Sequence, residues 1–139
     1  MGKQLTYKGV VYPWHCDHMG HMNVMWYVGK FDEATWAFFA RLGLTPTALR
    51  DAGRGMAALE QHIEYKREVL AGDILEIHSR LIEVKAKTIR FAHEMIDCET
   101  GKPTATTELV AAYLDTEARK AVVLPEHVRE ITQTMINEG

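Results

Sequence analysis

Cysteine is scarce in this chain, with Cys16 and Cys98 as the two examples in 139 residues. Two cysteines cannot form the disulfide framework of a small secreted domain. The first ten residues, MGKQLTYKGV, also lack the apolar core of a signal peptide. Both features predict a protein of the reducing cytoplasm.

Long apolar runs and clusters of one charge are missing as well. No stretch approaches the roughly 20 apolar residues that a membrane-spanning helix needs, so no membrane partner is expected. The 16 basic and 19 acidic residues give a net charge of −3, and no basic block interrupts them. Nucleic acid, whose phosphates need such a block, is therefore not an expected partner.

What is present suits one folded domain that spans residues 1–139. Hydrophobic residues make up 47% of the chain, which is too many for a disordered protein. The length lies in the commonest range for a single domain of about 100–150 residues. We find no internal repeat and no linker.

The first half of the chain predicts a strand followed by helices. Residues 5–14 suit a strand that ends at Pro13. Apolar residues then recur every three or four positions up to Leu42, and Gly43 is a typical residue after a helix end. The pair Thr45-Pro46 predicts the start of a short helix that reaches Ala52.

The second half alternates between apolar and polar residues, which predicts strands. The runs lie near residues 63–65, 75–81, 89–95 and 104–115, and Pro125 opens a final helix. The predicted class is α+β, with a sheet wrapped around the long helix. We expect an apolar outer face on this sheet, covered by a second copy.

The segment from Trp14 to Trp36, WHCDHMGHMNVMWYVGKFDEATW, carries most of the chemistry. Asp17 lies six residues before Asn23, which is a good residue for the N-cap of the long helix. The start of a helix offers free N–H groups and a positive dipole end, which can hold a developing oxyanion. The pattern therefore indicates acyl chemistry.

The Asp-x-x-Gly-His-x-Asn motif at residues 17–23 resembles hotdog-fold acyl-CoA thioesterases of the 4-hydroxybenzoyl-CoA thioesterase type. The resemblance covers residues 5 to about 116. It implies a five-stranded antiparallel sheet around a central helix, a homodimer or homotetramer, and a site between subunits. The implied reaction is hydrolysis of an acyl-CoA to the free acid and CoA, with Asp17 catalytic. The chain departs from many relatives at His15, Cys16, His18 and Met19.

Each residue of the motif has a candidate role. Asp17 would act as nucleophile or as general base. His21 would either support the loop or touch the thioester, and Asn23 would cap the helix or contact substrate or water. Gly20 would supply a backbone angle or a close approach that a side chain would forbid, and it is counted among the substrate-binding residues. The backbone N–H of Val24 would be the oxyanion hole.

Trp14, Trp26 and Tyr27 would either fill the core or line an acyl pocket as substrate-binding residues. Indole faces also attract quaternary ammonium groups. The version CDHMGHMN resembles thioesterases of carnitine and betaine breakdown, which makes betainyl-CoA a possible substrate.

Other chemistries fit less well. The His and Cys spacing of the loop matches no zinc pattern, and Cys16 has no evident base partner, so no metal and no thiol nucleophile are predicted. No phosphate loop or dinucleotide fingerprint is present, and no cofactor is predicted. A hotdog dehydratase or hydratase, or a non-catalytic acyl-thioester binding module, remains an alternative function.

Overall fold

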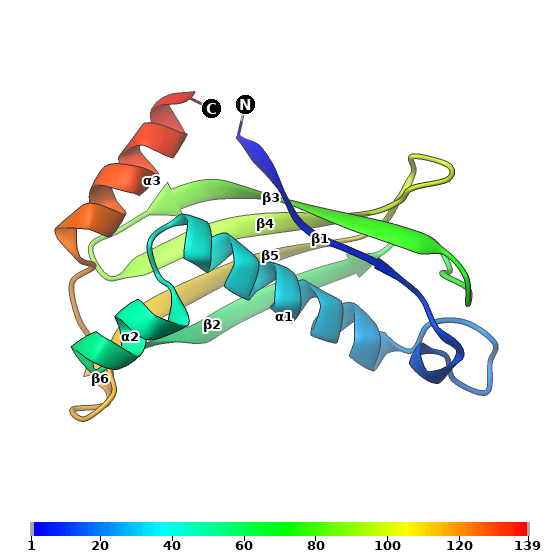
Figure 1. Cartoon of the computed structure of the whole chain (residues 1–139), viewed down its shortest axis with the longest axis horizontal. Coiled ribbons are helices and arrows are strands. Elements are labelled where there is room, and N and C mark those ends of the chain that lie inside the picture. Colours follow the sequence, from blue (N-terminus) through cyan, green and yellow to red (C-terminus); the bar gives the residue numbers. More distant parts are fainter. Residues whose placement is uncertain (1, 139) are drawn as a thin grey trace.

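The computed structural model describes residues 2–138. Its elements follow one another as β1 (Lys3–Val10), α1 (Val24–Arg41), α2 (Pro46–Ala52), β2 (Arg54–Tyr65), β3 (Ile74–Val84), β4 (Thr88–Asp97), β5 (Pro103–Asp115), β6 (Lys120–Ala121) and α3 (Glu126–Glu138). Helix α1 lies across one face of the sheet, and α3 closes one end (Figure 1).

The long strands form one antiparallel sheet in the order β1-β3-β4-β5-β2. This arrangement confirms the predicted hotdog fold, with five long strands around one central helix. Strand β6 adds two residues that pair with β5. It was not predicted, because two residues are too few to show a periodic pattern.

Helix α1 follows the predicted pattern closely. The Asn23 side chain accepts a hydrogen bond from the Met25 N–H and caps the helix. The face that carries Phe31 and Phe38 is fully buried against the sheet. Gly43 follows the helix with φ of 88°, a left-handed conformation that glycine adopts at little cost.

A buried histidine lies between α1 and the sheet. His93 is 2% exposed, with Thr35 Oγ1 at 2.8 Å from Nε2 and Ser79 Oγ at 2.6 Å from Nδ1. Burial lowers the pKa of His93 to about 4, so the imidazole is neutral near pH 7. The Thr35 hydroxyl donates to the Phe31 carbonyl and therefore accepts from Nε2–H, and the neutral ring then accepts at Nδ1 from Ser79.

Two strand boundaries differ from the prediction. Strand β1 ends at Val10, and residues Pro13–His15 form a short 3-10 helix, because proline has no N–H for a sheet and sets the backbone of a helical turn. Strand β2 begins at Arg54, well before the predicted run. It is an edge strand with both faces partly exposed, so it shows little alternation.

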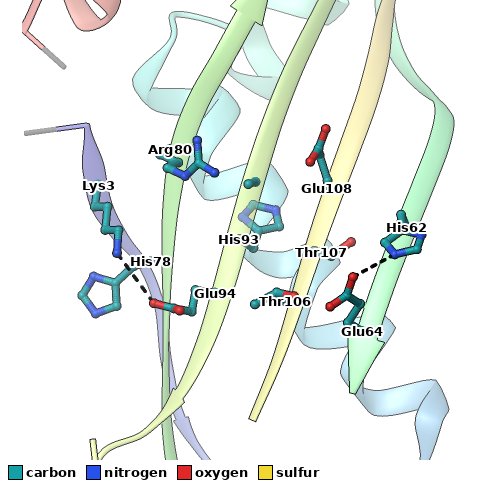
Figure 2. A pocket seen from close by; sticks show the side chains of 11 residues that line it. Lys3, His62, Glu64, His78, Arg80, His93, Glu94, Thr106, Thr107 and Glu108 are labelled. Carbon is teal, nitrogen blue, oxygen red and sulfur yellow. Dashed lines mark hydrogen bonds and ion pairs between the residues drawn. The ribbon is translucent and has the colours of Figure 1, made fainter. Parts of the chain in front are cut away.

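The prediction of an apolar outer face on the sheet is wrong. A groove of about 380 Å³ on the side away from α1 is lined by charged and polar residues. Figure 2 shows Lys3 beside Glu94 and His62 beside Glu64, at 3.7 and 3.2 Å. Alternate residues of the strands are charged here, and charged groups remain stable in water without a covering partner.

No helix within residues 2–138 has both the length and the apolar character needed to cross a membrane.

Candidate active site

The loop between β1 and α1 is tightly folded around Asp17. Cys16 and Met22 form an isolated antiparallel bridge, and the Gly20 N–H donates to the Asp17 carbonyl at 3.0 Å. Gly20 has φ of 85°, and a Cβ there would meet no atom within 4 Å. The predicted backbone angle is confirmed, and no neighbouring atom of residues 2–138 would meet a side chain at this position.

The Asp17 carboxylate is held by two hydrogen bonds. The Met19 N–H donates to Oδ1 at 2.9 Å, and the Asn23 amide Nδ2 donates to Oδ2 at 2.9 Å. These bonds, the one from Asn23 first, lower the pKa of Asp17 below its usual value. Asp17 is therefore a fixed anion at neutral pH.

Asn23 links this anion to the start of α1. Its Oδ1 caps the helix through the Met25 N–H, and its Nδ2 holds Asp17. The backbone N–H of Val24, the first residue of α1, takes part in no hydrogen bond of residues 2–138. The amide of Asn23 therefore connects the Asp17 anion to the capped start of α1, whose first N–H is unpaired.

His21 pairs with a residue that the motif does not contain. Its Nδ1 lies 2.9 Å from Oε1 of Glu68, in the segment between β2 and β3. Glu68 was not predicted, because nothing in a sequence connects residues 47 positions apart. The acid that the His21 side chain contacts is therefore Glu68 and not Asp17.

Aromatic side chains cluster beside the loop. The rings of Tyr12 and Trp14 stack with centroids 4.5 Å apart, and those of His15 and Trp26 are 4.6 Å apart. Trp14 is 66% exposed and thus open to a partner or ligand.

Tyr27, by contrast, belongs to the core. Its side chain is 5% exposed, its hydroxyl donates to the Arg67 carbonyl at 3.2 Å, and burial raises its pKa to about 12. The ring packs edge-on against Tyr65, with centroids 5.1 Å apart.

A separate apolar cavity of about 120 Å³ lies between α1 and β2. Its lining includes Val28, Asp32, Thr35, Trp36, Phe39, Met56, Ala58 and Leu109. None of the site residues predicted from sequence lines it. The indole of Trp36, a half-exposed residue of α1, lines this cavity.

The described residues include no group of three His, Cys, Asp or Glu side chains placed to hold a metal ion. Two of the three loop histidines have other partners. His15 Nδ1 accepts from the Tyr12 N–H at 2.9 Å, and His21 is paired with Glu68.

The fold and the loop define a hotdog thioesterase, and comparison with known proteins identifies the family. A profile of the thioesterase-like superfamily matches residues 11–131, so the chain belongs to this superfamily. It is accordingly a thioesterase, that is, a hydrolase of the hotdog family. The hydratase and the non-catalytic module are therefore set aside.

Two curated relatives share a substrate in their names. The L-carnitine dehydrogenase/betainyl-CoA thioesterase of Agrobacterium fabrum is 33% identical over 109 residues, which are 78% of this chain. The aligned part spans only 22% of that longer enzyme. The betainyl-CoA thioesterase of Pseudomonas aeruginosa is 25% identical over 84% of this chain and 73% of its own length.

Solved structures support the fold. The DHNA-CoA thioesterase of Staphylococcus aureus superposes with a TM-score of 0.87 at 15% identity, covering 100% of this chain and 96% of its own. Another Staphylococcus aureus protein, solved in complex with CoA, gives a TM-score of 0.85 at 22% identity, covering 99% of this chain and 85% of its own.

Proposed function

We propose that this thioesterase hydrolyses an acyl-CoA at Asp17. The observation that carries the proposal is the unit of Asp17, Asn23 and Val24, in which one amide holds the carboxylate and caps the helix whose first N–H is unpaired. A fixed anion that is tied through one side chain to the start of a helix with an unused N–H suits an electrophilic carbonyl with a developing negative oxygen.

In this mechanism the thioester oxygen accepts from the Val24 N–H. Either an Asp17 oxygen attacks the carbonyl carbon, or Asp17 removes a proton from a water that attacks it. The C–S bond then breaks and the thiolate of CoA leaves with the electron pair. In the first route, water cleaves the resulting anhydride and restores Asp17.

The substrate we propose is betainyl-CoA. The names of the Agrobacterium and Pseudomonas relatives support this acyl group, and the CoA held by the Staphylococcus aureus protein supports the carrier. An indole is also available for a quaternary ammonium, because Trp36 lines an apolar cavity that contains the carboxylate-bearing Asp32.

The complete site is proposed to form between two copies paired through β2. This edge strand is long and carries Leu59 at 57% exposure, which a single copy leaves in water. Tyr65, at one end of β2, contacts Tyr27 near the start of α1, while Met56, near the other end, lines the cavity. Antiparallel pairing of two β2 strands therefore brings the Asp17 loop of one copy toward the cavity of the other.

A panel of acyl-CoA substrates with detection of free thiol tests the function. We expect CoA release from betainyl-CoA at a higher kcat/KM than from acetyl-CoA or benzoyl-CoA. Activity on a neutral acyl-CoA alone would remove betaine and keep the thioesterase. Binding of every substrate without release of thiol would refute the proposed reaction.

A further inference from the structure

The Glu68 carboxylate contacts His21 from the segment between β2 and β3. The Nδ1–Oε1 distance of 2.9 Å is that of a good hydrogen bond. The Glu68 side chain is 73% exposed and that of His21 is 32% exposed. Contact between two such side chains has meaning only if the backbone holds them together, since exposed pairs are weak alone.

The backbone does hold them together. On one side of Glu68, the Val69 carbonyl accepts from the Met22 N–H at 2.7 Å, and both of these side chains are buried. On the other side, the Arg67 carbonyl accepts from the Tyr27 hydroxyl at 3.2 Å. Glu68 is thus fixed between a tie to the catalytic loop and a tie to α1.

The tie to Met22 also fixes His21, which precedes Met22 in the chain. His21 is further held because its carbonyl accepts from the Asp17 N–H at 3.1 Å. Met22 and Val69 thus form one backbone hydrogen bond between buried residues, and His21 and Glu68 directly precede them in the chain. This bond brings the two side chains together.

We infer that Glu68 is a positioning residue that sets the orientation and tautomer of His21, an inference that rests on the proposed thioesterase site. An ionised carboxylate has no proton to give, so the His21 Nδ1–H donates to it. Nε2 then remains as the free nitrogen, which can hydrogen-bond the thioester or its attacking water. A carboxylate that orients a catalytic imidazole in this way is a recurring device in hydrolases.

The chain provides a matched control. Glu76 and His78 form a similar contact on β3, with Nε2 of His78 3.1 Å from Oε1 of Glu76. Strands β4 and β5 separate β3 from the β2 edge, so this pair lies away from the proposed site and from the proposed pairing strand. Glu76→Gln removes the same charge from an equivalent pair and should leave the site unaffected.

The experiment compares Glu68→Ala, Glu68→Gln and Glu76→Gln with the unaltered protein, first by ¹⁵N NMR of the His21 ring nitrogens. We expect the proton on Nδ1 in the unaltered protein and in Glu76→Gln. We expect it to move to Nε2 in Glu68→Ala, and to stay on Nδ1 in Glu68→Gln, whose amide oxygen still accepts. Thermal unfolding verifies that each variant is folded.

Steady-state kinetics on the most active acyl-CoA complete the test. We expect kcat to fall about tenfold in Glu68→Ala with little change in KM, which is a smaller loss than removal of a whole acid–base group causes. We expect kcat to recover largely in Glu68→Gln. An unchanged His21 tautomer in Glu68→Ala, or an unchanged kcat, overturns the inference. Absence of thiol release from the unaltered protein would instead refute the proposed function, and the NMR result would still decide whether Glu68 positions His21.

Discussion

The buried histidine predicts a loss of stability in mild acid. His93 is enclosed by the rings of Phe31 and Phe91 and bonded to the hydroxyls of Thr35 and Ser79, with no charged partner. Its pKa is about 4 in the folded chain, against an ordinary value of 6.5 for the unfolded chain. Because the unfolded state binds the proton more readily, acid favours unfolding.

The expected size follows from this difference. The free energy of unfolding should be constant above about pH 6.5 and decrease as the pH falls toward 4. One pKa unit corresponds to about 1.4 kcal/mol, so the full contribution is about 3 kcal/mol, of which about 2 kcal/mol is lost between pH 7 and pH 5.

Urea unfolding followed by tryptophan fluorescence, at one protein concentration and a series of pH values, measures this loss. His93→Gln retains groups that can bond Thr35 and Ser79 but does not titrate. Its stability should be lower at pH 7 and nearly independent of pH between 5 and 7. An equally steep pH dependence in His93→Gln would refute the assignment to His93.

Three further predictions concern the site. Asn23→Ala should lower the free energy of unfolding by about 1 kcal/mol through the lost cap, and it should also reduce turnover. Asn23→Ser should restore stability more than turnover. Parallel recovery of both would contradict the double role of this amide. Trp36→Leu should weaken betainyl-CoA binding by about 0.5–2 kcal/mol while an uncharged 3,3-dimethylbutanoyl-CoA loses less, and equal losses would indicate packing alone. Leu59→Lys should be monomeric by sedimentation and have little activity in the thiol assay. The control Ile136→Lys, on α3, should be neither monomeric nor inactive. An active Leu59→Lys monomer would exclude a site shared through β2.

The sequence predicted the parts of this molecule that depend on local patterns. Helix α1 and its Asn23 cap follow from apolar spacing and one N-cap residue, and the positive φ at Gly20 follows from glycine in a tight loop. The beginning of β2 was missed, because an exposed edge strand does not alternate.

Contacts between distant segments were beyond local patterns. The Glu68–His21 pair and the cavity at Trp36 depend on how β2 and the following turn pack beside α1. Aromatic residues near the motif could be recognised as a group, but their separation into an open Trp14 and a buried Tyr27 required the fold.

The carboxylate of Asp17 is the centre of the proposed chemistry, and its replacement by an amide is the most direct test. Asp17→Asn keeps the size of the side chain and can still accept from the Met19 N–H, but it loses the charge that attacks the thioester or activates water. Asp51→Asn, an exposed acid in α2, is the matched control.

The decisive measurement is the rate of CoA release by Asp17→Asn, with the fold verified by circular dichroism and with Asp51→Asn assayed in parallel. We predict that Asp17→Asn loses about 10²–10⁴-fold in kcat while Asp51→Asn keeps the activity of the unaltered protein. A folded Asp17→Asn protein that releases CoA at nearly the normal rate would contradict the assignment of Asp17 as the catalytic group.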